Sequence, residues 1–136
     1  MHIFAIANQK GGVGKTTTAV NLAAALAANG QRTLLVDLDP QGNATMGSGV
    51  DKRSLHSSVY QVLLQLATLE GARIASPSGH FDVLPANRDL AGAEVELVDL
   101  DRREMRLKEA LAAHRADYDF VLIDCPPSLS MLTLNG

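Results

Sequence analysis

The sequence predicts an α/β fold in which helices cover both faces of a doubly wound, parallel sheet. Short, continuous apolar runs alternate along the chain with longer runs of helical periodicity, which is the pattern of a parallel sheet buried on both faces. Hydrophobic residues make up 46% of the 136 residues and aromatic residues only 4%, so we expect a core of Ala, Leu, Val and Ile. This length is typical of one domain.

The first three elements are expected to form a β–α–β unit. The apolar run over residues 2–7 predicts a buried strand. A helix is expected over residues 16–29, where alanine, valine and leucine line one face, and Gly30 is its expected C-terminal stop. The run 33–36 predicts a second buried strand, which ends at Asp37. Such crossovers are almost always right-handed.

The rest of the chain is expected to add further helices and two strands. Polar and glycine-containing residues predict a loop from residue 38 to residue 49. The later elements expected are a helix over 57–69, a strand over 81–85, helices over 90–99 and 102–114, a strand over 120–124 and the beginning of a helix over 128–134. The apolar side of the helix over 57–69 is expected to comprise Val59, Val62, Leu63, Leu66 and Ala67.

Charge and cysteine content exclude several classes of protein. The formal net charge of −3 gives no global electrostatic basis for nucleic-acid binding, although a local basic patch stays possible. The single cysteine, Cys125, excludes an internal disulfide and fits a reducing compartment. No signal segment opens the chain, and no apolar run reaches the roughly 18 residues that a spanning helix needs. We therefore expect a soluble, cytoplasmic protein.

Residues 10–17, with the sequence Lys-Gly-Gly-Val-Gly-Lys-Thr-Thr, connect the first strand to the first helix. Backbone N–H groups of a glycine-rich turn and the positive end of the following helix converge on one centre, where they bind phosphate. Lys15 adds a full positive charge, and the hydroxyl of Thr16 can ligate the magnesium that accompanies a nucleoside triphosphate. The segment predicts a phosphate-binding loop.

Acidic residues follow two of the other predicted strands. Asp37 and Asp39 come after the second strand and Asp124 ends the last one, so all three can converge on the loop at the carboxyl edge of the sheet. Phosphoryl transfer uses such acids to hold magnesium and to orient the attacking water. The sequence leaves other roles open, because Asp37 and Asp39 can be helix-cap or turn residues and Asp124 can simply end a strand.

The loop departs from the ordinary phosphate-binding pattern, because Gln9 stands where glycine is usual and Lys10 adds an early lysine. This form resembles the deviant Walker A loop of the ParA/Soj partition ATPases in the MinD/ParA superfamily. The chain resembles their shorter, chromosomal, Soj-like type, which lacks an additional N-terminal DNA-binding segment. Further resemblance to this family lies in residues 36–43, 84–87, 90–94 and 121–129.

The resemblance implies a P-loop NTPase domain over residues 1–136 that binds ATP and Mg²⁺. In this family Lys15 would contact the β- and γ-phosphates, Thr16 would ligate the metal and Thr17 would contact the α-phosphate. The nucleotide-binding residues that the resemblance implies are Gly11, Gly12, Val13, Gly14, Lys15, Thr16 and Thr17.

Further roles for the lysine and the acids are also implied by the resemblance. Lys10 would reach across a nucleotide-sandwich dimer to the partner's ATP, and Asp39 would position the attacking water. Asp37 and Asp124 would support Mg²⁺, through water. The implied catalytic residues are therefore Lys10, Lys15 and Asp39, and the implied metal residues are Thr16, Asp37 and Asp124.

The function implied is Mg²⁺-dependent ATP hydrolysis in chromosome or plasmid partition, by an ATP-dependent homodimer that acts with a ParB-like centromere-binding protein. Family members continue with further strands and helices that carry the adenine contacts and the residues for nonspecific DNA binding, so the chain is expected to be the N-terminal part, with an exposed edge strand. Nucleoid association would require that DNA binding. The alternatives are a nucleotide-binding interaction module without turnover and a MinD-like cell-division ATPase, for which no membrane helix is present in the sequence.

Overall fold

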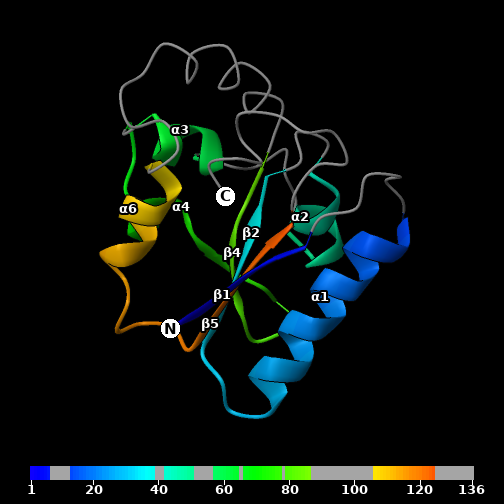
Figure 1. Cartoon of the computed structure of the whole chain (residues 1–136). Coiled ribbons are helices and arrows are strands. Elements are labelled where there is room, and N and C mark those ends of the chain that lie inside the picture. Colours follow the sequence, from blue (N-terminus) through cyan, green and yellow to red (C-terminus); the bar gives the residue numbers. More distant parts are fainter. Residues whose placement is uncertain are drawn as a thin grey trace.

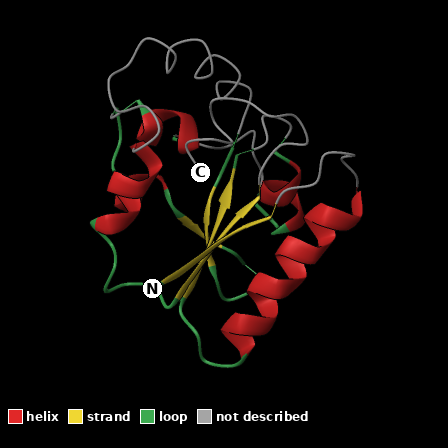
Figure 2. Ribbon diagram, viewed as in Figure 1, coloured by secondary structure: helices red, strands yellow, loops and turns green. Residues whose placement is uncertain are grey.

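One mixed sheet forms the centre of the computed structural model (Figures 1 and 2). The model describes residues 1–6, 13–38, 42–50, 57–64, 66–77, 79–86 and 106–124. The strand order is β1-β5-β2-β4-β3, and every neighbouring pair is parallel except β3 with β4. The strands are β1 His2–Ile6, β2 Thr33–Asp37, β3 Ile74–Ala75, β4 Asp82–Leu84 and β5 Phe120–Asp124. The predicted α/β class is confirmed.

Helices cover both faces of this sheet (Figure 2). Alternate strand residues point to opposite faces, and they join two separate hydrophobic clusters: Leu35 and Leu122 lie in one, Val36 and Ile123 in the other. On the first face lie α1 Val13–Ala28 and α2 Asn43–Gly47, and on the second lie α3 Val59–Leu63, α4 Leu69–Ala72 and α6 Arg106–Ala112. None of the described helices is long and apolar enough to cross a bilayer.

Helix α1 packs against the sheet through small side chains. Ala19 and Ala23 are completely buried, which lets the helix approach the strands closely. The helix begins at Val13, earlier than residue 16 where the sequence predicts it. Its predicted stop is confirmed, because Gly30 adopts a left-handed φ of 82° and its N–H donates to the carbonyl of Ala27 at 3.0 Å.

The sequence predicts one continuous helix over residues 57–69, and this prediction is wrong. The structure has two short helices, α3 and α4, with a turn between them. Thr68 is the N-cap of the second helix and so cannot continue the first: its backbone is extended and its Oγ1 accepts a hydrogen bond from the N–H of Gly71 at 3.0 Å. As a result Leu66, expected on the apolar side, lies in the turn with 71% of its surface exposed.

Two elements occur where the sequence predicts no helix or strand. Helix α2 forms within the segment 38–49 that was expected to be a loop, and β3 adds an antiparallel edge to β4. In the turn between β3 and β4, His80 adopts a left-handed φ of 58°. The helices expected over 90–99 and 128–134 lie outside the described residues.

The amino edge of the sheet is tied together by Arg32 and Asp119. The guanidinium Nη2 of Arg32 lies 3.1 Å from Asp119 Oδ1, and the backbone N–H of Arg32 donates to Asp119 Oδ2 at 2.8 Å. A further bond from Arg32 Nη1 reaches the carbonyl of Ala116 at 2.8 Å. These bonds join the start of β2 to the turn that leads into β5.

Strand β1 is one of the two edge strands of the described sheet, and β3 is the other. It pairs with β5 on one side, and no other described strand pairs with it. Its side chains Ile3 and Phe4 are 42% and 51% exposed. The expected exposed edge strand is therefore present within the part of the chain that the structure describes. The prediction that the run 2–7 is buried is wrong, because β1 pairs with a described strand on one side only.

Candidate functional site

The carboxyl ends of three strands lie in one row. In the register of the parallel pairs, Ile6 at the end of β1 lies opposite Asp124 of β5, and Asp124 lies opposite Asp37 of β2. The N–H of Leu38 donates to the carbonyl of Asp124 at 3.0 Å and continues the contact past the end of β2. The structure thus brings together two of the acids that the sequence predicts at this edge.

Both acids project from the same face of the sheet as α1. Register partners in a parallel pair point to the same side, and residues two apart on a strand do so too. Leu35 and Leu122, each two residues before its acid, pack in the cluster that contains Ala19 of α1. Asp37 and Asp124 therefore lie on the α1 side of the carboxyl edge.

The N-terminus of α1 lies at this same edge. The helix of 16 residues is about 24 Å long, and its C-terminal end leads within a few residues to Thr33, at the amino end of β2. Its first turn therefore lies at the opposite, carboxyl end. The first N–H groups of a helix have no partner within the helix, and the helix dipole is positive there. An anion at this edge would be stabilised.

The structure describes the predicted loop only in part. The backbone from residue 13 to residue 17 belongs to the first turns of α1, although residues 13–15 were expected to precede the helix. Lys10 and Asp39 lie outside the described residues. The predicted binding residues whose backbone is helical, and whose side chains the structure does not describe, are Val13, Gly14, Lys15, Thr16 and Thr17; Gly11 and Gly12 lie outside the described residues.

Burial makes the two acids unusual. Asp37 and Asp124 both have 0% of their surface exposed. Neighbouring strands are about 5 Å apart, and two carboxylates buried at such a distance repel each other unless donors or a cation compensate their charge. Asp37 has part of this compensation, because its Oδ2 accepts hydrogen bonds from the backbone N–H of Thr45 at 2.9 Å and from Thr45 Oγ1 at 2.7 Å.

This pair of acids fits Mg²⁺ in the company of phosphate. Mg²⁺ prefers oxygen ligands and is usually held by one or two carboxylates, with substrate phosphates and water completing the shell. Among the described residues no group of three or more metal-ligating side chains occurs, so the described acids do not form a complete protein cage. Two buried carboxylates beside the positive end of a helix match a metal–phosphate site.

The contacts of Asp37 also bear on the alternative that it is a helix-cap residue. Thr45 lies in the first turn of α2, whose cap position is Gly42, a residue without a side chain. Asp37 accepts from the N–H of Thr45 and so satisfies an amide of that turn. Capping and metal support are compatible uses of the same carboxylate. Sequence reasoning missed Thr45, and the only local signal was a threonine three residues after a glycine.

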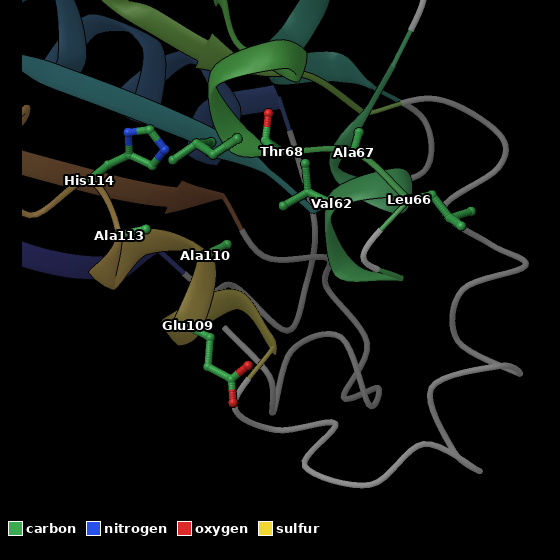
Figure 3. Close-up of a pocket in the computed structure, with 9 residues that line it drawn as sticks. Val62, Leu66, Ala67, Thr68, Glu109, Ala110, Ala113 and His114 are labelled. Atoms are coloured by element: carbon green, nitrogen blue, oxygen red, sulfur yellow. The ribbon is translucent and has the colours of Figure 1, made fainter.

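A separate cavity of about 480 Å³ lies on the opposite face of the sheet (Figure 3). One wall comes from α3 and the turn into α4, and the other from α6 and the turn that follows it. The cavity is mainly apolar, and its lining is Val62, Leu66, Ala67, Thr68, Leu69, Glu109, Ala110, Ala113 and His114. The acids at the carboxyl edge do not contribute to it.

Comparison with known proteins agrees with this architecture. The chain is 55% identical over 134 residues to the sporulation initiation inhibitor protein Soj of Bacillus subtilis, covering 98% of this chain and 53% of Soj. It is 53% identical over 134 residues to the chromosome partitioning protein ParA of Myxococcus xanthus, covering 98% of this chain and 47% of ParA. The chain thus spans about half the length of these relatives.

This chain also resembles a solved structure in three dimensions. Cobyrinic acid a,c-diamide synthase from Mycobacterium smegmatis, with a bound ATP analog and magnesium, matches with a TM-score of 0.95 and 51% identity, over 99% of this chain and 55% of that one. A family model described as AAA domain matches residues 1–136. Since this model spans the whole sequence, and the relatives named Soj and ParA match 98% of the chain, the chain belongs to this AAA domain family, in its ParA/Soj group of P-loop NTPases.

Proposed function

We propose that the chain binds ATP with Mg²⁺ at the carboxyl edge of β1, β5 and β2, and that it hydrolyses ATP as part of a partition protein of ParA/Soj type. The observation that carries the proposal is the in-register pair of buried acids, Asp37 and Asp124, beside the N-terminus of α1. The relatives named Soj and ParA support the biological setting, and the matched structure with an ATP analog and magnesium supports the ligands.

The proposal assigns the following roles to residues of this chain. Backbone N–H groups at the start of α1 and the ammonium group of Lys15 bind the phosphates, while Thr16, Asp37 and Asp124 hold the metal directly or through water. When bound, Mg²⁺ neutralises charge on the terminal phosphate oxygens. Asp39 would orient the attacking water.

Assembly belongs to the same proposal. Lys10 would contact ATP bound to the partner subunit of an ATP-dependent homodimer, and a ParB-like protein would act on that dimer. The names of the relatives support this part of the proposal, and they also support a cytoplasmic location, with association with the nucleoid where DNA binding is retained.

A second candidate is ATP-dependent amide synthesis. It is favoured by one observation, the 51% identity to the solved structure named as a diamide synthase. Both candidates require the same ATP and Mg²⁺ site, but they differ in the acceptor of the phosphoryl group. Release of phosphate from ATP in water, with no carboxylic acid substrate and no amide donor present, favours the partition ATPase.

Binding of a fluorescent ATP analogue, with Mg²⁺ and with EDTA, tests the proposed site. We expect Mg²⁺ to tighten binding by the unmodified chain, and Asp124→Asn to reduce this gain at least tenfold. Asp82→Asn is the matched control, because Asp82 is a strand carboxylate at the amino end of β4 and accepts a hydrogen bond from Tyr118 at 2.7 Å, which an amide oxygen also accepts. Equal loss in both variants would contradict the proposed site. Phosphate release that persists in Asp39→Ala would refute the role of Asp39.

A further inference from the structure

We propose that Thr45 is a positioning residue for the metal–phosphate site, which fixes the carboxylate of Asp37 through its hydroxyl and its backbone N–H. The inference rests on the proposed function, since it assigns a residue to that site. Thr45 lies on α2, eight residues beyond Asp37, in a segment that the sequence predicts to be a loop.

The hydrogen bonds around the Thr45 hydroxyl allow only one direction for its proton. A hydroxyl has one proton to donate and two lone pairs that accept. The N–H of Ala86 can only donate, and it lies 3.0 Å from Thr45 Oγ1. The hydroxyl proton is therefore available for Asp37 Oδ2, at 2.7 Å. Thr45 thus presents a donor to Asp37, and Ala86 fixes the orientation of that donor.

Both bonds from Thr45 converge on one carboxylate oxygen. Its backbone N–H reaches Asp37 Oδ2 at 2.9 Å, next to the hydroxyl bond to the same atom. Two donors to one oxygen stabilise the ionised carboxylate and restrict its rotation about the side-chain bonds. Asp37, Thr45 and Ala86 all have 0% of their surface exposed, so water does not compete for these bonds.

Helix α2, which carries Thr45, is itself held in place by hydrogen bonds and packing. Ser48, the residue that follows α2, donates from its Oγ to the carbonyl of Ala44 at 2.8 Å, and Ser76 Oγ donates to the carbonyl of Ser48 at 2.7 Å. Gly47 lies next to α1, since an added Cβ would be in van der Waals contact with a methyl group of Val20 at 3.4 Å. Helix α2 is therefore held between α1 and the β3–β4 edge, and it can hold Thr45 in one place.

Helix capping alone does not explain the hydroxyl. A cap needs only the bond from the backbone N–H of Thr45 to Asp37, and any residue at position 45 supplies it. The hydroxyl adds a second bond to Asp37 and a link to the end of β4 at Ala86. If the hydroxyl serves the metal site, its removal will weaken the response to Mg²⁺ specifically. If it serves only the fold, its removal will lower stability and leave that response unchanged.

Three variants test the proposal. Thr45→Val keeps the shape and removes the hydroxyl, Thr45→Ser keeps the hydroxyl, and Ser76→Ala removes a buried hydroxyl that supports α2 without touching Asp37. The readouts are the Mg²⁺ concentration that gives half of the full gain in affinity for a fluorescent ATP analogue, and the affinity for this analogue in EDTA. Folding of each variant is followed by far-UV circular dichroism.

We expect Thr45→Val to raise the half-saturating Mg²⁺ concentration about tenfold, the size expected when one hydrogen bond to a charged group is lost. Affinity in EDTA should change less than twofold. Thr45→Ser and Ser76→Ala should both stay within twofold of the unmodified chain in the Mg²⁺ response. In an Asp37→Asn background, Thr45→Val should have less than a threefold further effect, because Thr45 acts through Asp37.

Two results would overturn the inference while leaving the proposed function intact. One is a Thr45→Val variant that loses stability but responds to Mg²⁺ like the unmodified chain. The other is a Thr45→Ser variant whose Mg²⁺ response shifts more than fivefold although it retains the hydroxyl, and this comparison remains valid if Thr45→Val does not fold. Absence of any Mg²⁺-dependent binding by the unmodified chain would instead overturn the proposed function, and the inference with it.

Discussion

Replacement of Asp124 by asparagine should stabilise the ligand-free protein while it weakens the binding of Mg²⁺. Asp124 and Asp37 are register partners on neighbouring strands and both are fully buried. Two unit charges about 5 Å apart repel each other by about 3 kcal/mol at an effective dielectric constant of about 20. The amide is isosteric and removes one of the two charges. Allowing for the desolvation and pairing of the new amide, we expect the free energy of unfolding to rise by about 1–2 kcal/mol.

Chemical denaturation in EDTA measures this effect. The chain contains no tryptophan, so far-UV circular dichroism is the appropriate signal. Asp82→Asn serves again as the control and should not raise the free energy of unfolding, because Asp82 has no register partner of like charge among the described strands: it pairs with Leu34 and Ala75. A fall of more than about 1 kcal/mol in Asp124→Asn would refute the reasoning. It would show that favourable contacts of Asp124 outweigh its repulsion by Asp37.

Two further predictions concern stability away from the site. His80 has a φ of 58°, so His80→Gly should raise the free energy of unfolding by about 0.5–1 kcal/mol in thermal denaturation, whereas Gly30→Ala, at a φ of 82°, should lower it by about 1 kcal/mol; equal effects of the same sign would contradict the backbone argument. The hydrogen bonds and charge of Arg32 lower the pKa of Asp119 from 3.8. A lowered folded-state pKa gives stability that is present above about pH 4 and is lost as the pH falls through the folded value. Arg32→Ala should therefore lose less stability than the unmodified chain between pH 6 and pH 3, and an unchanged pH profile would count against this pairing.

Strands β2 and β5 were predictable because each is a continuous apolar run that the sheet buries on both faces, whereas β3 has only two residues and was missed. The expected run 120–124 matches β5, and 33–36 with Asp37 matches β2. Helix α2 was not predictable by periodicity, since five residues are too few to show a helical pattern. The division between α3 and α4 was missed because Thr68 is compatible with a helix interior and acts as a cap only in this backbone conformation.

The candidate site, like the fold, could be predicted from the sequence only in part. Asp37 and Asp124 were predicted to converge because parallel strands end at one edge, and their register shows that they do. The role of Thr45 depends on a contact with Ala86, on a different strand end and 41 residues away, and no local pattern reports such a contact. The roles of all the predicted site residues, including the metal roles of Asp37 and Asp124, stay predictions.

The strand order has a consequence for how this chain folds. Strands β1 and β2 are close in sequence, yet β5, the last described strand, lies between them. Among the described strands, β1 has no partner until β5 has been inserted between β1 and β2, and the row of strand ends is incomplete until then. Pairing over such long sequence separations is slow. On the ribosome, the carboxyl edge would thus form only after residue 124 has been synthesised. If the chain binds nucleotide as proposed, that ability would follow the insertion of β5 between β1 and β2, and a bound nucleotide would report a chain in which these three strands have paired.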